Sequence, residues 1–177
     1  METITIYKNI YQVSSPIYKQ LDVILKRIKM GESKSLIKKI RLEKDKTKRN
    51  RLKTNLPAIC FSGIFKKRND KSILEHSGII CLDFDDYKSK KDLLNAKEHL
   101  SKDKYVHSVF ISPSEKGLKV LVKTPKETNR HIDFFNSLEK HFNSVFFDKK
   151  CKNLSRVCYE SYDPNIFINN NSLMWVN

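Results

Sequence analysis

The sequence contains little glycine, proline or cysteine and no long apolar run. Four Gly and five Pro in 177 residues argue against a repeat-rich or low-complexity chain. No run approaches membrane-spanning length and the start, Met1–Thr3, is acidic, so we expect a cytoplasmic protein without a signal peptide or membrane contact. The cysteines at 60, 81, 151 and 158 lack the spacing of a zinc site, so reduced thiols are expected.

Acidic residues are also scarce, and the formal net charge is +15. Residues 26–53 hold thirteen basic and three acidic residues, which is ten of those fifteen excess charges. Such clustering favours a polyanionic partner, although a lysine-rich proteome would also raise the overall charge. Residues 43–55 are consistent with a solvated helix or loop, with a phosphate-contacting arm, or with both. The candidate nucleic-acid-binding residues are Lys38, Lys39, Arg41, Lys46, Lys48, Arg49, Arg51 and Lys53.

Apolar periodicity predicts alternating strands and helices in the N-terminal half. Ser14–Pro16 is typical of a helix start, and Ile17, Leu21, Ile24 and Ile28 follow at helical spacing up to Gly31. The other expected elements are a strand over Thr3–Ile10, a helix over Ser33–Arg41 and a strand over Leu56–Phe65 interrupted at Ser62-Gly63.

The order of strands and helices expected in the C-terminal half predicts an α+β fold. Its expected elements are strands at Ser77–Asp86, Val106–Ile111, Leu118–Lys123, Val157–Tyr159 and Asn165–Ile168, and helices at Lys88–Ser101 and Asn129–Phe142. A β-α-β-β-α-β order is the split βαβ arrangement, an antiparallel sheet of the RRM-like kind with helices on one face. We therefore expect an N-terminal basic α/β subdomain at 1–78 and a second subdomain at 79–177.

Two carboxylates lie at the end of the most apolar strand. Asp83 and Asp85 are two residues apart, so in a strand both point to the same face. Their repulsion would raise the pKa of one, and a hard divalent cation such as Mg²⁺ or Mn²⁺ would relieve it. An acidic turn after a buried strand is the simpler alternative, and Asp86 points the other way.

Two further stretches carry phosphate-binding residue types. The stretch 112–119, a turn and the start of the next strand, holds Ser112, Ser114, Lys116 and Lys119, whose hydroxyl and ammonium groups can cradle phosphates, although an ordinary hairpin loop has a similar composition. Asp148 follows two phenylalanines and can supply a third carboxylate. The guanidinium of Arg156 can bind phosphate through two hydrogen bonds or form a surface ion pair.

Taken together and in this order, these motifs resemble the archaeo-eukaryotic primase, or primase-polymerase, superfamily. The motifs are Leu82–Asp85, the stretch 112–119 and Phe147-Asp148. A closer resemblance, over roughly residues 50–170, is to the primase-like N-terminal domain associated with virulence-associated-E-type helicases. That resemblance depends on Leu56-Pro57, Phe61–Phe65, Ser77–Asp85 and Asn153–Arg156.

The resemblance implies a primase-polymerase catalytic core that transfers nucleotides on a single-stranded DNA template, with nucleoside triphosphates as substrates and a replicative helicase as partner. Asp83, Asp85 and Asp148 would be catalytic and hold two Mg²⁺ or Mn²⁺ ions. The nucleotide would be bound by Ser112, Ser114, Lys116, Lys119 and Arg156, and the basic segment 26–53 would follow the template.

The chain departs from the superfamily pattern at two positions, and alternatives stay open. Lys119 stands where the superfamily has a phosphate-binding histidine, and Glu115 stands where a glycine is usual. Both departures favour a non-catalytic nucleic-acid-binding or regulatory domain on the same fold. A haloacid-dehalogenase-type phosphohydrolase lacks support, because Asp86-Tyr87 replaces the Gly-Thr expected after Asp85. A nuclease that uses the same carboxylates is a further alternative.

Overall fold

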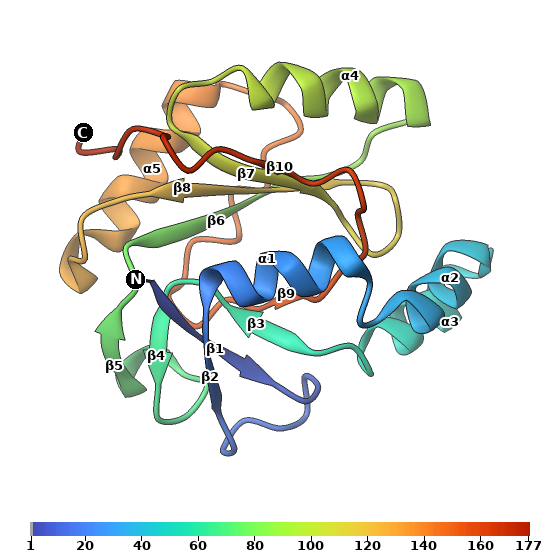
Figure 1. Cartoon of the computed structure of the whole chain (residues 1–177), viewed down its shortest axis with the longest axis horizontal. Coiled ribbons are helices and arrows are strands. Elements are labelled where there is room, and N and C mark those ends of the chain that lie inside the picture. The colour runs from blue at the N-terminus through green and yellow to red at the C-terminus, as the bar shows by residue number, and fades with distance from the viewer. Residues whose placement is uncertain (1) are drawn as a thin grey trace.

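The computed structural model describes residues 2–177 as two antiparallel four-stranded sheets, a separate two-stranded hairpin and five α-helices. Figure 1 shows α1 (Leu21–Met30) between the strands of the two sheets, with α4 (Lys90–Ser101) and α5 (His131–Phe142) on the far side of the second sheet. No helix within residues 2–177 is long and apolar enough to cross a membrane.

The first sheet joins the two ends of the chain. Its order is β2 (Ile17–Gln20), β1 (Thr3–Tyr7), β3 (Ala58–Cys60) and β9 (Cys158–Tyr159). Because β9 comes from the C-terminal region, the chain crosses back over the boundary expected at residue 78. The division into two subdomains at this boundary stays a prediction. The hairpin of β4 (Gly63–Phe65) and β5 (Ile73–His76) extends from this region.

The second sheet confirms the predicted α+β class and the split βαβ arrangement. Its order is β10 (Phe167–Ile168), β7 (Val106–Ile111), β8 (Leu118–Lys123) and β6 (Ile79–Phe84). Strand β8 lies between β6 and β7 and is antiparallel to both. Because β6 and β7 are joined through α4, they form a βαβ unit with β8 inserted between its strands.

The helices largely follow the predicted apolar periodicity. They are α1 (Leu21–Met30), α2 (Lys34–Leu42), α3 (Lys46–Lys53), α4 (Lys90–Ser101) and α5 (His131–Phe142), with short 3-10 helices at Asp70–Ser72 and Thr128–Arg130. Gly31 ends α1 at φ 82°, a left-handed conformation that glycine adopts without a steric penalty. Ser89 and Asp45 cap α4 and α3 through their side chains.

Strand β6 separates two apolar layers because its side chains alternate between the faces of the sheet. Ile80, Leu82 and Phe84 pack with residues of α4 and α5. Ile79 and Cys81 face the other way and pack with α1 and the first sheet. Asp83 has the same parity as this second set, so its carboxylate enters the space between the sheets.

Two buried carboxylates of the C-terminal segment connect the layers. Glu160 accepts hydrogen bonds from Arg27 of α1 (2.7 Å) and from the Ser33 hydroxyl. Asp163 accepts from Lys97 of α4 (2.6 Å) and from the backbone N–H of Ile111 in β7 (2.9 Å). Both carboxylates are at most 2 % exposed, and each fixes the C-terminal segment against a helix, Asp163 also against β7.

Three expectations for the N-terminal half were wrong in detail. Ile17 begins strand β2 instead of a helix, because it pairs with Ile6 of β1, and the helix starts at Leu21. No strand was expected at 73–76, but this segment forms β5 by pairing with β4. The expected strand over Leu56–Phe65 is divided between β3 and β4, which belong to different sheets.

Candidate functional site

Asp83 is the penultimate residue of β6 and is almost fully buried, at 8 % exposure. Its cross-strand neighbour in β8 is Lys119, and the two side chains form an ion pair. Burial lowers the pKa of the Lys119 ammonium, but the Asp83 carboxylate, with a smaller contribution from Asp85, outweighs this and raises that pKa. Lys119 therefore stays charged and neutralises Asp83.

Asp148 reaches this site because residues 146–148 run beside the end of β6. The backbone N–H of Asp85 donates to the carbonyl of Phe146, and that of Asp148 donates to the carbonyl of Asp83, both at 2.8 Å. Packing supports the pairing, since the Phe84 and Phe147 rings meet edge to face at 5.3 Å. The structure thus brings together Asp83 and Asp148, which are 65 positions apart in the sequence.

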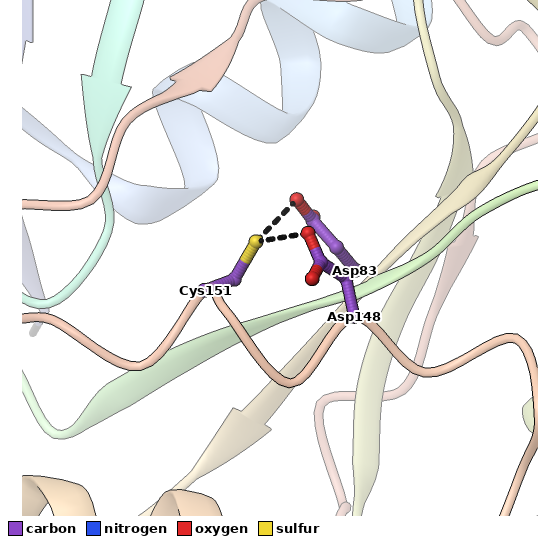
Figure 2. Close-up of side chains that lie close together, drawn as sticks. All are labelled: Asp83, Asp148 and Cys151. Carbon is purple, nitrogen blue, oxygen red and sulfur yellow. Dashed lines mark hydrogen bonds between the residues drawn. The ribbon is translucent and has the colours of Figure 1, made fainter.

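Cys151 completes a three-ligand cluster that sequence reasoning missed. In Figure 2 its sulfur faces both carboxylates, 3.2 Å from Oδ2 of Asp83 and 3.0 Å from Oδ2 of Asp148. One candidate ligand atom from each residue lies within 4.8 Å of the others. Burial, with the two carboxylates, raises the pKa of the Cys151 thiol, so it is protonated and donates. Its position three residues after Asp148 was the available signal.

Asp85 lies just beyond the strand and outside this three-ligand cluster. Its carboxyl pKa is raised, first by burial and then by Asp83 and Asp148, while Lys119 opposes the shift. Gly117 makes room for it, because a Cβ at residue 117 would lie 2.0 Å from Asp85 Oδ1 and 2.7 Å from the Phe84 carbonyl. Burial therefore raises the Asp85 carboxyl pKa most, and the repulsion expected among these carboxylates adds to it.

Asp85 and Asp148 also line an open cleft of about 470 Å³. Ser114 and Lys116 from the β7–β8 loop lie in the same cleft, and so does the exposed Asp86. Phosphate-binding residue types therefore adjoin two of the predicted metal ligands.

Ser112 and Glu115 shape the loop. Ser112 is buried, and its hydroxyl accepts from the backbone N–H of Gly117 at 3.1 Å. Glu115 has φ 55°, the left-handed conformation that favours glycine, which is the residue usual at this position in the resembling superfamily. Its carboxylate pairs with Arg41 at 3.2 Å, which offsets the negative charge near the cleft.

Arg156 lies near the cluster but does not line the cleft. Its Nη2 lies 4.0 Å from Asp148 Oδ2, and its side chain is about half exposed. It lines a small cavity together with Asp83, Cys151 and His131. Burial raises the carboxyl pKa of Asp148. Hydrogen bonds from Cys151 and the Lys150 N–H, together with the charges of Arg156 and Lys119, outweigh burial and lower this pKa overall.

The eight basic residues predicted to bind nucleic acid fall into three groups. Lys38, Lys39, Lys48 and Arg51 are exposed and lie outside the cleft. Arg41 is engaged by Glu115 and by the carbonyl of Tyr162 (2.7 Å). The three remaining residues line the cleft, and these are Lys46, Arg49 and Lys53.

The fold and site define a two-sheet α+β domain with a carboxylate–thiol cluster beside a basic cleft. The family model for the BT4734-like N-terminal domain matches residues 51–167, and the chain belongs to this family. No curated protein sequence matches the chain.

Among solved structures, the chain is similar to the AEP domain of the primase-polymerase of cyanophage S-2L. That similarity has 12 % identity and a TM-score of 0.49, and it covers 99 % of this chain and 83 % of the phage chain. The likeness assigns no residue and no activity. The narrower resemblance, to the virulence-associated-E-type helicase group, stays a prediction.

Proposed function

We propose that the chain is a template-dependent nucleotidyltransferase of the primase-polymerase type, acting on nucleoside triphosphates with a single-stranded DNA template. The observation that supports this most is the convergence of Asp83, Asp85 and Asp148 beside a cleft lined by basic side chains. Separately spaced sequence motifs that resemble one superfamily thus meet at one place. On the same resemblance, the protein would serve replication of a phage, plasmid or mobile element in the cytoplasm, with a helicase as partner.

The carboxylates suit Mg²⁺ or Mn²⁺, because hard oxygen donors are the ligands these ions prefer. Asp83 and Asp148 add to the effect of burial in raising the carboxyl pKa of Asp85, and a cation there would relieve their repulsion. When bound, such ions stabilise the attacking and leaving oxygens of an in-line displacement. Ser114 and Lys116 would orient the triphosphate in the cleft.

A primer-extension assay with Mn²⁺, labelled nucleotides and a single-stranded template tests this proposal. We expect extended products from the wild-type chain and a loss of at least about 100-fold for Asp85→Asn or Asp148→Asn. Asp133→Asn, an exposed carboxylate on α5, is the matched control and should retain full activity. Equal product from the site variants would reject the assignment, and loss of intact template would indicate a nuclease.

A second candidate is a non-catalytic nucleic-acid-binding domain, and one observation favours it. Asp83 is already satisfied without a cation by the Lys119 ammonium and the Cys151 thiol. Under this alternative, calorimetry would detect salt-sensitive binding of single-stranded DNA but no binding of Mn²⁺ or Mn²⁺–nucleotide. Metal-dependent nucleotide binding by the wild-type chain would exclude it.

A further inference from the structure

The helix α3 presents two faces that carry similar charges but have different surroundings. Lys46, Arg49, Asn50 and Lys53 are spaced three and four residues apart, so they share one face. All four line the cleft with Asp85, Asp148, Ser114 and Lys116. Lys48 and Arg51 lie on the opposite face, are exposed and do not line the cleft.

The charges of this cleft are not balanced. Five basic side chains and three acidic ones line it, and within residues 2–177 no ion pair engages Lys46, Arg49, Lys53 or Lys116. The buried Nε of Arg49 has no hydrogen-bond partner in the described part of the chain. An unsatisfied buried donor is costly, and an anion would relieve it.

Lys53 shows the same imbalance. Burial, followed by the nearby charge of Arg49, lowers the pKa of its ammonium, while Asp85 only partly opposes the shift. Lys116 and Lys119 also contribute repulsion. Several positive groups from α3 and the β7–β8 loop are therefore close enough to repel one another. A polyanion with closely spaced charges would stabilise all of them together.

The position of this face favours a phosphate chain over a template strand. Asp85 and Asp148 line the same cleft, and under the proposed function the triphosphate must lie next to those carboxylates. We infer that Lys46, Arg49 and Lys53 bind the phosphate chain of the incoming nucleotide, so that α3 forms one wall of the nucleotide site. This inference rests on the proposed function.

The test compares two charge-matched double variants in the full chain. Calorimetry would measure tripolyphosphate binding without metal and dATP binding with Mn²⁺ for Arg49→Gln/Lys53→Gln and for Lys48→Gln/Arg51→Gln. We expect the first pair to weaken both ligands by at least about tenfold, because two charge-assisted contacts are lost. The second pair should stay within about twofold of wild type for both ligands, because neither side chain lines the cleft.

Arg49 also donates to the Glu43 carbonyl at 3.2 Å, so its loss can loosen the start of α3. Lys46→Gln/Lys53→Gln leaves that bond intact and should weaken tripolyphosphate in the same way. Unchanged tripolyphosphate binding in this variant, or an equal loss in Lys48→Gln/Arg51→Gln, would overturn the inference. If the wild-type chain incorporates no nucleotide yet the cleft variants lose tripolyphosphate, the proposed function fails and the phosphate site stands.

Discussion

Asp83 and Asp85 are two residues apart, but they belong to regions with opposite electrostatics. The buried region around Asp83 is internally satisfied, with Lys119 as counter-charge and Cys151 as hydrogen-bond donor. The open cleft around Asp85 carries an excess of basic side chains without ion-pair partners among residues 2–177. The buried region thus contributes to the fold without a ligand. In the cleft, a bound anion would relieve the repulsion among the basic side chains, and a bound cation would relieve the repulsion on Asp85.

Removing Lys119 should produce the largest change and tests whether the buried region is structural. Lys119→Ala leaves the Asp83 carboxylate buried without its partner, and we expect a loss of about 3–5 kcal/mol in the free energy of unfolding. Lys53→Ala, which removes a cleft lysine crowded by like charges, should cost less than about 0.5 kcal/mol or stabilise the protein. Urea denaturation measures both variants.

The same variant separates the two candidate functions. If Asp83 is a metal ligand that Lys119 neutralises, then Mn²⁺ should restore part of the stability that Lys119→Ala loses. A variant as stable as wild type without metal would show that the ion pair contributes little. The comparison between the two regions would then be wrong.

The buried region should also be the more acid-sensitive of the two. His131, which lines the small cavity beside Asp83, is hydrogen-bonded through Nδ1 to Nε2 of His76 at 3.0 Å. Burial lowers the pKa of each histidine to about 4. Between the ordinary pKa of 6.5 and this value the unfolded chain binds more protons, so stability falls as the pH falls through that window.

We expect this loss to approach roughly 3 kcal/mol for each histidine and to level off below about pH 4. Urea denaturation at several pH values measures it. His107, which is also buried with a pKa of about 4, contributes in the same direction, so the double variant His76→Gln/His131→Gln should flatten the profile only in part. His99→Gln, at an exposed position, should leave the profile unchanged. A profile that the double variant leaves intact would remove the pair as its source.

Gly117→Ala tests whether cation binding in the cleft depends on the position of Asp85. The added Cβ would overlap Asp85 Oδ1 and the Phe84 carbonyl, so Asp85 must move. We expect about 1–3 kcal/mol of destabilisation from overpacking and a clear loss of Mn²⁺ affinity by calorimetry. Ser114→Ala, in the same loop, should leave Mn²⁺ affinity unchanged. Normal metal binding by Gly117→Ala would mean that the position of Asp85 does not matter for the cation.

Local patterns predicted the elements whose partners lie nearby in the sequence. Strands β7 and β8 match their predicted bounds, since each is rich in β-branched and other apolar residues and the two flank a short turn. Strand β5 was missed because its residues are half polar and its strand character depends on pairing with β4. Ile17 fits a helical pattern as well as a strand pattern, and it lies in a strand because it pairs with β1.

The candidate site divides in the same way. The sequence motifs pointed to Asp83 and Asp148, and the structure places them together. The place of Cys151 depends on how the chain turns after Asp148, which no periodicity records. The division of the basic segment into a cleft-lining face and an exposed face also needed the structure, because it depends on where α3 packs.

The smallest effect concerns Glu115, at the edge of the cleft. Its left-handed backbone costs about 1–2 kcal/mol relative to glycine, while its exposed pair with Arg41 contributes at most about 1 kcal/mol. Glu115→Gly should therefore stabilise the protein by up to about 1 kcal/mol. Glu115→Gln keeps the strain and loses the charge, so it should be neutral or slightly destabilising. Thermal melting would measure both. If Glu115→Gly melts below the wild-type protein, then the Arg41 pair outweighs the backbone strain, and the charge at this edge of the cleft has a structural role.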